Sequence, residues 1–294
     1  MILLFFVLCI LSSGFTGNIY KKLADESRSL TSSILMPPFW YLMLAVLFGI
    51  MAMLEKNAAP AAVLPAILGG VGMFTAACIL IESMKYGGFS IPIIIINLNF
   101  IIPVILSSFF LNEKAAAIQV IGMVTSVAVI VLLNLRPNPN QDKVNLRKSL
   151  ILAVGACIAN GLVNFFIKIN DNAGGSQNVF FAILYLSAAV CGVLLALLVT
   201  AVKKEKFHIS GAVNKITVPW LLLLGVCNGI CFYMTGLIAG HMNAAAQFTI
   251  VTAASILLSL AVGILFQHEK LTWKVAVSFI LCLFAVGCQA FTLL

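Results

Sequence analysis

One acidic residue, Glu82 in ILIESMKYGG, lies within an apolar segment of this chain, whereas the other Asp and Glu residues fall between such segments. A carboxylate in apolar surroundings can exchange a proton or bind a cation. Glu82 is also close to the end of its segment, and Lys85 follows three residues later. A carboxylate that reaches water or pairs with Lys85 is therefore the alternative. The first interpretation makes Glu82 the best candidate for a proton-coupling residue.

Two side-chain amides, Asn97 and Asn99, lie in the apolar segment 89–111, between Pro92 and Pro103. Each proline removes a backbone donor and can kink a helix, which frees carbonyl groups near a cavity. The two asparagines are two positions apart, about 200° around a helix, so they cannot face one cavity. We expect one of them, with Asn97 as our candidate, to line a cavity and the other to bond a neighbouring helix.

Other segments also carry polar or aromatic side chains that could contact a small ligand. Gln247 is a better candidate than the threonines near it, which can bond back to the preceding turn of their own helix. Aromatic rings could hold a cation by their faces, although Trp and Tyr are also ordinary residues of the membrane interface. The complete set of predicted ligand contacts is Asn97, Gln247, Asn228, Tyr233, Asn164 and Trp40.

These residues sit in a chain whose composition is that of a membrane protein. Of its 294 residues, 62% are hydrophobic and 9% are charged, whereas soluble domains are about a quarter charged. The apolar runs are continuous rather than alternating, which predicts membrane-spanning helices and excludes a β-barrel. The predicted helices span residues 2–20, 32–53, 61–84, 89–111, 115–135, 149–169, 178–202, 217–239, 244–266 and 272–292.

Several other classes of protein and site are not expected. The net charge of +8 comes from basic residues in short loops, which orient membrane helices and do not indicate nucleic-acid binding. The eight cysteines lie in apolar runs without a Cys-x-x-Cys motif or a Cys/His cluster, so we expect no metal and no cofactor. We interpret the apolar start, MILLFFVLCILSSGFTG, as a retained first helix rather than a signal peptide.

The chain contains a weak internal repeat. FFLNEK at 109–114 matches LFQHEK at 265–270, and GFTGNIYK at 14–21 matches GLVNFFIK at 161–168. The Pro- and Asn-rich link at 136–148 separates five segments from five, which divides the chain into repeats 1–135 and 149–294. Because each half has an odd number of helices, the second would enter the membrane inverted. We interpret Glu113-Lys114 and Glu269-Lys270 as helix boundaries that mark a duplication rather than as chemistry.

The order of these motifs resembles the drug/metabolite transporter superfamily, in its ten-helix EamA-like branch. NGLVNFFIK at 160–168 is similar to the family's first-helix pattern, which the first half keeps only in Gly14, Asn18 and Lys21. MKYGGFS at 84–90 is similar to the link between the third and fourth helices. FFLNEK followed by IQVIGMVTSVAVIVL resembles the end of the fourth helix and the fifth, and LFQHEKLTWKVAVSFILCLFAVG repeats that pattern.

This resemblance implies a secondary active transporter that moves a small polar or amphipathic metabolite or drug by alternating access, often with proton coupling. We expect no enzyme, because the sequence lacks a phosphate-binding loop and a catalytic Ser/His/Asp set. A flippase for a lipid-linked sugar or headgroup, and a non-transporting scaffold or sensor subunit, remain alternatives. The expected location is the bacterial inner membrane or a plasma membrane, with a small-molecule substrate and the lipid bilayer as partners. Homodimer formation stays open.

The orientation in the membrane has two conflicting predictions. Alternate loops, after the odd-numbered segments, contain fourteen of the 17 Lys and Arg residues, which places both termini outside. The family resemblance implies that both termini are cytoplasmic. The glycines at 69–72, and the pairs Gly225/Gly229 and Gly236/Gly240, predict that their two segments pack closely against other helices.

Overall fold

The chain folds as a bundle of helices. The computed structural model describes residues 2–27, 29–56, 59–87, 90–134, 146–203, 213–266 and 273–290. The first half contains α1 (Ile2–Glu26), α2 (Leu30–Leu54), α3 (Val63–Gly87), α4 (Ser90–Asn97), the 3₁₀ helix η1 (Leu98–Phe100), α5 (Ile101–Phe110) and α6 (Ala117–Asn134). The second half contains α7 (Leu146–Asn172), α8 (Gln177–Lys203), α9 (Thr217–Ala239), α10 (Ala244–Phe266) and α11 (Trp273–Ala290).

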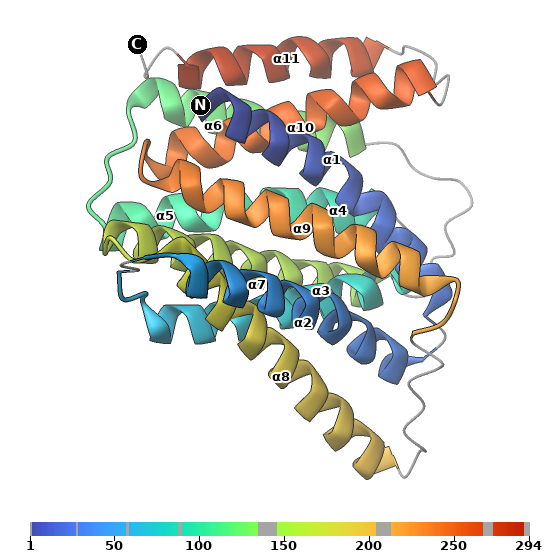
Figure 1. Cartoon of the computed structure of the whole chain (residues 1–294). Helices are drawn as coiled ribbons and strands as arrows, with labels where there is room; N and C mark the ends of the chain where they lie inside the picture. Colours follow the sequence, from blue (N-terminus) through green and yellow to red (C-terminus); the bar gives the residue numbers. More distant parts are fainter. Residues whose placement is uncertain are drawn as a thin grey trace.

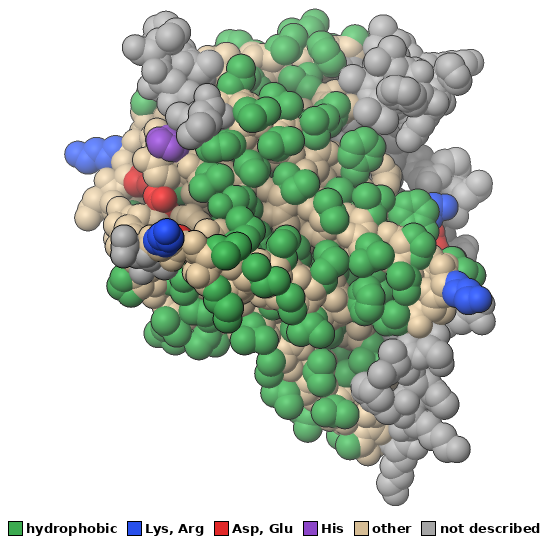
Figure 2. Space-filling model, viewed as in Figure 1, with side chains coloured by type: hydrophobic (Ala, Val, Ile, Leu, Met, Phe, Trp, Pro, Cys, Tyr) green, Lys and Arg blue, Asp and Glu red, His purple; other side chains and the backbone are tan. Residues whose placement is uncertain are grey.

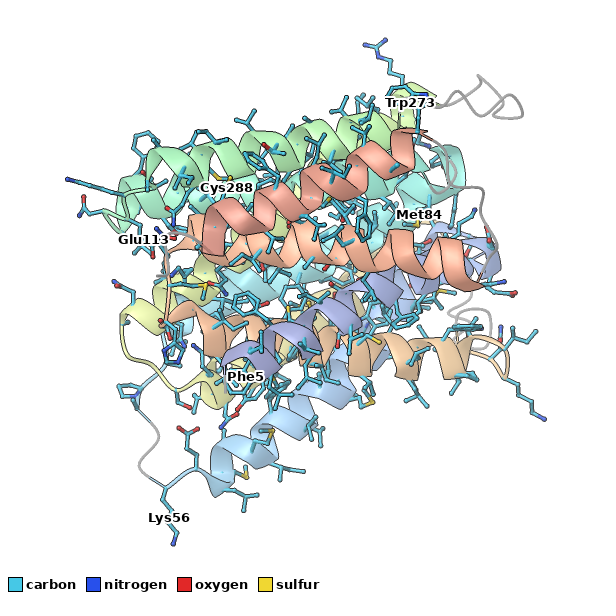
Figure 3. The ribbon with its side chains drawn as sticks, turned by 90° about the horizontal axis from the view of Figure 1, so that it is seen from above. Phe5, Lys56, Met84, Glu113, Trp273 and Cys288 are labelled. Atoms are coloured by element: carbon cyan, nitrogen blue, oxygen red, sulfur yellow. The ribbon has the colours of Figure 1, made fainter. Side chains whose placement is uncertain are left out.

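The helices lie side by side, and the two chain termini lie at the same end of the bundle (Figure 1). Seen from above, Glu113 and Lys56 lie at this end, while Met84 and Trp273 lie toward the other (Figure 3). We call these the Glu113 end and the Met84 end. The up-and-down path follows from long apolar helices joined by short links. Each link keeps the chain at one end of the bundle, so the next helix must run back to the opposite end.

Within the described residues, six helices are long and apolar enough to cross a membrane, and four shorter apolar helices accompany them. Hydrophobic side chains cover most of the face in Figure 2, where charged side chains gather at the edges. Apolar side chains such as Leu42, Val46 and Leu198 are more than half exposed. A helical bundle with such a surface fits lipid, because helices satisfy their own backbone groups. The composition-based prediction of a multi-pass helical membrane protein agrees with this structure.

The fourth predicted segment, 89–111, is broken where the sequence predicted one spanning helix. Its α-helical turns end at Asn97 and resume at Ile101, with η1 between them. Pro103 accounts for the break, because it has no N–H to donate to the carbonyl of Asn99 and its ring crowds that carbonyl. The break faces α7, where a Cβ added to Gly161 would lie 2.9 Å from the Asn99 oxygen. The kink that the two prolines predicted is therefore a short 3₁₀ turn.

The helices pack in a few dominant pairs. The most extensive contacts join α3 to α7, α2 to α8, α1 to α9, α3 to α8 and α6 to α11, in that order. Buried side chains form one large hydrophobic cluster on α1, α2, α3, α7, α8 and α9, and a smaller one on η1, α5, α6, α10 and α11. The broken helix bridges the clusters, since Ile93 and Ile96 pack on the large one while Leu98 and Ile101 pack on the small one.

The predicted close approach at glycines is confirmed. A Cβ at Gly70 on α3 would lie inside the van der Waals distance of the Leu184 carbonyl oxygen and of Ser187 on α8. A Cβ at Gly225 on α9 would lie 3.1 Å from Cβ of Trp40 on α2. Thus α3, through the glycines at 69–72, packs closely on α8, and α9, through its glycines at four-residue spacing, packs closely on α2.

Candidate functional site

A buried ion pair closes the Glu113 end of the bundle. Lys168, near the end of α7, places its ammonium 2.9 Å from Oε1 of Glu113, in the link between α5 and α6. The Lys168 side chain is 5% exposed and the Glu113 side chain 23%. A buried charge needs a partner and further hydrogen bonds to offset its lost hydration, so the surroundings of this pair decide whether it is stable.

The two side chains also cap two helix termini. The Lys168 ammonium donates to the carbonyl oxygen of Ala239 at 2.8 Å and to that of Met242 at 2.7 Å, where α9 ends. Glu113 Oε2 accepts from the backbone N–H of Ala244 at 2.6 Å, where α10 begins. Each charge has the sign that suits its helix terminus. The pair therefore holds the α9–α10 turn from both sides and joins it to α7 and to the α5–α6 link.

Amide side chains extend this network to α6 and α11. Asn243 accepts from the N–H of Ala246 at 3.0 Å and donates to Oε1 of Gln119 at 3.0 Å. Gln119, on α6, offers its backbone carbonyl to the side chain of Gln289 on α11, at 2.9 Å. We call Glu113, Lys168, Asn243, Gln119 and Gln289 the end network. It connects helices of the large cluster with helices of the small one.

A polar pocket of about 350 Å³ opens beside the ion pair. Asp171 and His241 line it together with Glu113 and Lys168. Asp171 lies over Gly240, where an added Cβ would be 3.0 Å from both carboxylate oxygens. The charged and imidazole side chains at this edge of the molecule are visible in Figure 2.

Aromatic rings occupy the centre of the large hydrophobic cluster. They form a continuous chain of ring contacts with centroids 5.1–6.4 Å apart, within the range of favourable aromatic pairs. We call this set the aromatic cluster, and its members are Tyr20, Trp40, Tyr41, Phe48, Phe181, Tyr185 and Tyr233. It joins α1, α2, α8 and α9.

Two polar atoms in this cluster are buried without a hydrogen-bond partner, Nε1 of Trp40 and the hydroxyl of Tyr185. Both residues are 0% exposed. By contrast, the Tyr41 hydroxyl donates to the carbonyl of Met73 at 3.1 Å, and the Tyr20 hydroxyl accepts from Asn228 at 3.4 Å. A buried unpaired donor costs free energy, so such groups often mark function. The two unpaired groups therefore identify the aromatic cluster as a candidate ligand site.

The structure brings three of the predicted ligand contacts to this cluster. Trp40 and Tyr233 are members of it, and Asn228 touches it through Tyr20. Asn164 lies elsewhere, buried on α7 one helical turn before Lys168. Asn97 is at the N-terminus of η1 and is partly exposed. The six predicted contacts therefore do not form one group.

Gln247 makes a contact between helices. It is 0% exposed, and its Nε2 donates to the carbonyl of Thr235 on α9 at 2.6 Å, while its Oε1 has no partner. Thr235 in turn lies 3.5 Å from Sγ of Cys9 on α1. Gln247 thus links α10 to α9 and α1, the kind of interhelical hydrogen bond that the sequence predicted for one of the asparagines.

Glu82 lies near the Met84 end and pairs with Lys85, as the alternative interpretation of its sequence position predicted. Its Oε1 accepts from the ammonium of Lys85 at 2.6 Å and from the hydroxyl of Ser33 at 2.5 Å. Lys85 also donates to Ser33 at 2.6 Å and to the carbonyl of Ser29 at 3.2 Å. The group ties the end of α3 to the start of α2.

Replacing Glu82 by Gln separates these two roles. A structural ion pair predicts that Glu82→Gln and Lys85→Met lower the free energy of unfolding by similar amounts, about 1–3 kcal/mol. A coupling role predicts in addition that only Glu82→Gln abolishes the pH dependence of transport. Thermal unfolding in detergent and flux in liposomes across pH measure the two effects. Full activity of Glu82→Gln at every pH would rule out coupling.

The sequence interpretation missed the ion pair, although both partners lay in motifs that it identified. Lys168 ends NGLVNFFIK, and Glu113 begins the Glu-Lys pair of FFLNEK. A lysine at the end of an apolar helix is a usable signal, because it needs a carboxylate or free carbonyls nearby. We interpreted Glu113 as a boundary residue because sequence spacing does not show which loops meet at one end.

Comparisons with known proteins support the fold alone. No family model and no curated protein matches this chain. Among solved structures, one described only as "Crystal structure of protein" aligns with a TM-score of 0.70 at 16% sequence identity. The alignment covers 97% of this chain and 98% of that one. The helices therefore have an arrangement found in a solved structure over nearly the whole chain.

Proposed function

We propose that this chain is a secondary transporter of the drug/metabolite transporter type, built from two inverted five-helix repeats. The helix pairing carries this proposal. If the halves 1–135 and 149–294 are exchanged, α1–α9 becomes α7–α3, while α2–α8 and α6–α11 map onto themselves. These four pairs are among the five with the most extensive contacts; the fifth, α3–α8, becomes α9–α2, which is also in contact but less extensively. Inverted repeats of this kind place a substrate site between the halves. When the two repeats exchange conformations, the site opens to one side of the membrane and then to the other.

Two lysines in equivalent positions of the proposed repeats have different surroundings, which supports alternating access. Lys168 is buried and paired with Glu113, whereas Lys21 on α1 is 33% exposed and pairs with Asp25 of its own helix at 2.6 Å. The two lie at opposite ends of the bundle in an inverted arrangement. A transporter caught in one of its two states would have such a difference between its two ends.

The aromatic cluster is our proposed substrate site, and a small polar or amphipathic molecule is the proposed substrate. Trp40→Phe removes the unpaired indole N–H and keeps an aromatic ring. Since this N–H makes no hydrogen bond of good geometry within the described part of the chain, we expect the free energy of unfolding to change by less than about 1.5 kcal/mol, whereas affinity for a ligand that accepts from it falls about tenfold. The melting temperature without ligand measures the change in stability, and its shift on adding ligand measures the change in affinity. If the ligand shifts the melting temperature of Trp40→Phe as much as that of the unaltered protein, Trp40 does not contact the ligand.

The transport function itself is tested with the purified protein in liposomes. Metabolites that raise the melting temperature in a library screen are first selected, because a ligand of the folded state stabilises it. Liposomes loaded with the unlabelled compound should then accumulate its labelled form by exchange, and protein-free liposomes should not. Accumulation without a second protein would exclude the scaffold or sensor alternative.

A flippase for a lipid-linked sugar or headgroup is the second candidate of the same class. It needs an opening toward the lipid between helices, and transfer of a fluorescent lipid between leaflets would detect it. For the location we propose the bacterial inner membrane or a plasma membrane. The basic loops support termini on the outside, and a reporter that is active only in the cytoplasm, fused to either terminus, tests that orientation.

A further inference from the structure

Cys9 on α1 and Cys231 on α9 hold their thiols in contact. Their Sγ atoms are 3.6 Å apart, and the Cys9 thiol donates to the carbonyl of Cys231 at 3.6 Å. Both are free thiols. The contact joins two helices that pack along their length, so it is held by the body of the fold rather than by a loop.

The two thiols differ in access. Cys9 is 0% exposed, and its Sγ also lies 3.5 Å from the hydroxyl of Thr235. Cys231 is partly exposed. Because Cys231 is the more exposed of the two thiols, we expect a small uncharged oxidant to reach it before Cys9, whose sulfur lies in contact with it. An accessible thiol next to a second one is the arrangement in which oxidation stops at a disulfide.

We propose that Cys9 and Cys231 form an oxidation site at which hydrogen peroxide links α1 to α9. In the first step Sγ of Cys231 attacks one peroxide oxygen, the O–O bond breaks, and the thiol becomes a sulfenic acid as one water leaves. In the second step Sγ of Cys9 attacks the sulfenic sulfur, the S–O bond breaks, and the hydroxyl leaves as water with the proton of Cys9. The two thiols lose two electrons, which the peroxide accepts.

The reaction must bring the two sulfur atoms from 3.6 Å to a bond length of about 2.05 Å. The resulting disulfide would connect residues 222 positions apart. Because it restricts the unfolded chain, it should raise the melting temperature. The linkage would also fix α1 relative to α9 near Thr235, which bonds Gln247 of α10.

The test is oxidation of the full-length protein in liposomes by increasing hydrogen peroxide, followed by digestion without reducing agent and mass spectrometry. We expect one peptide pair that joins Cys9 to Cys231, a melting temperature raised by several degrees, and loss of both effects after dithiothreitol. Cys9→Ala and Cys231→Ala should each abolish the linked pair. Cys227→Ala, one turn from Cys231 on α9, is the matched control and should keep it.

Three outcomes would overturn the proposal. Sulfinic acid on Cys231 with an unmodified Cys9 would mean that the thiols do not meet. A linked pair that persists in Cys9→Ala would place the bond elsewhere. Two thiols that stay reduced at peroxide concentrations that oxidise exposed methionines would show that oxidants do not reach the site. The inference does not depend on the proposed transport function.

Discussion

Replacing Lys168 by Met should lower the free energy of unfolding by about 3–5 kcal/mol. The substitution leaves the partly buried carboxylate of Glu113 without its cation and the carbonyls of Ala239 and Met242 without their donor. Removing one partner of a buried pair costs more than the pair contributes, because the other charge remains desolvated. Thermal unfolding of the purified protein in detergent measures the effect.

Two further variants separate charge from packing. Lys114→Met, at an exposed neighbouring position, should change stability by no more than about 0.5 kcal/mol. The double variant Lys168→Met/Glu113→Gln should be more stable than Lys168→Met alone, because the uncompensated charge is gone. If Lys168→Met and Lys114→Met unfold at the same temperature, the end network does not stabilise the fold.

Replacing Gly70 by Ala should be the most damaging single-methyl change that the described glycines offer. A Cβ there meets the carbonyl oxygen of Leu184 and lies 2.9 Å from the backbone nitrogen of Ala188. Backbone atoms cannot turn aside as a side chain can, so α3 and α8 must separate. Overpacking costs about 1–3 kcal/mol where side chains yield, and we expect Gly70→Ala to reach or exceed the upper value.

Gly49→Ala, on α2, is the matched control. A Cβ at this position has no atom within 4 Å, and Ala favours a helix over Gly by up to about 1 kcal/mol. We therefore expect Gly49→Ala to unfold at the same temperature as the unaltered protein or slightly above it. Equal losses in Gly70→Ala and Gly49→Ala would contradict the close contact of α3 with α8.

Sequence patterns predicted the helices well because lipid imposes one simple requirement, a long apolar stretch. They also identified Pro92 and Pro103 as residues that can kink the segment 89–111, and the glycines at 69–72 as a place of close helix contact. The 3₁₀ turn could not be predicted, since whether a proline bends or breaks a helix depends on its neighbours, here α7 at Gly161. Periodicity signals were weak throughout because apolar residues surround each helix.

The candidate site was harder to predict for a different reason. Polar type and depth identified Trp40, Asn228 and Tyr233, which do meet at the aromatic cluster. The three-residue spacing already offered Lys85 as a partner of Glu82, but the sequence could not show that Ser33 joins them or that Lys168 reaches Glu113. Those contacts depend on which helix ends meet, and this follows from the packing of elements far apart in the chain.

We propose that this protein is an alternating-access transporter in which the Lys168–Glu113 pair closes the Glu113 end. Labelling of Asn97→Cys by a membrane-impermeant maleimide, applied separately to each side of oriented vesicles and read at position 97 by mass spectrometry, tests it most directly. We expect Asn97→Cys to be labelled only from the side of the Met84 end. Once Lys168→Met is introduced, we expect it to be labelled from the side of the Glu113 end as well. Equal labelling of Asn97→Cys from the Glu113 side with and without Lys168→Met would contradict this proposal.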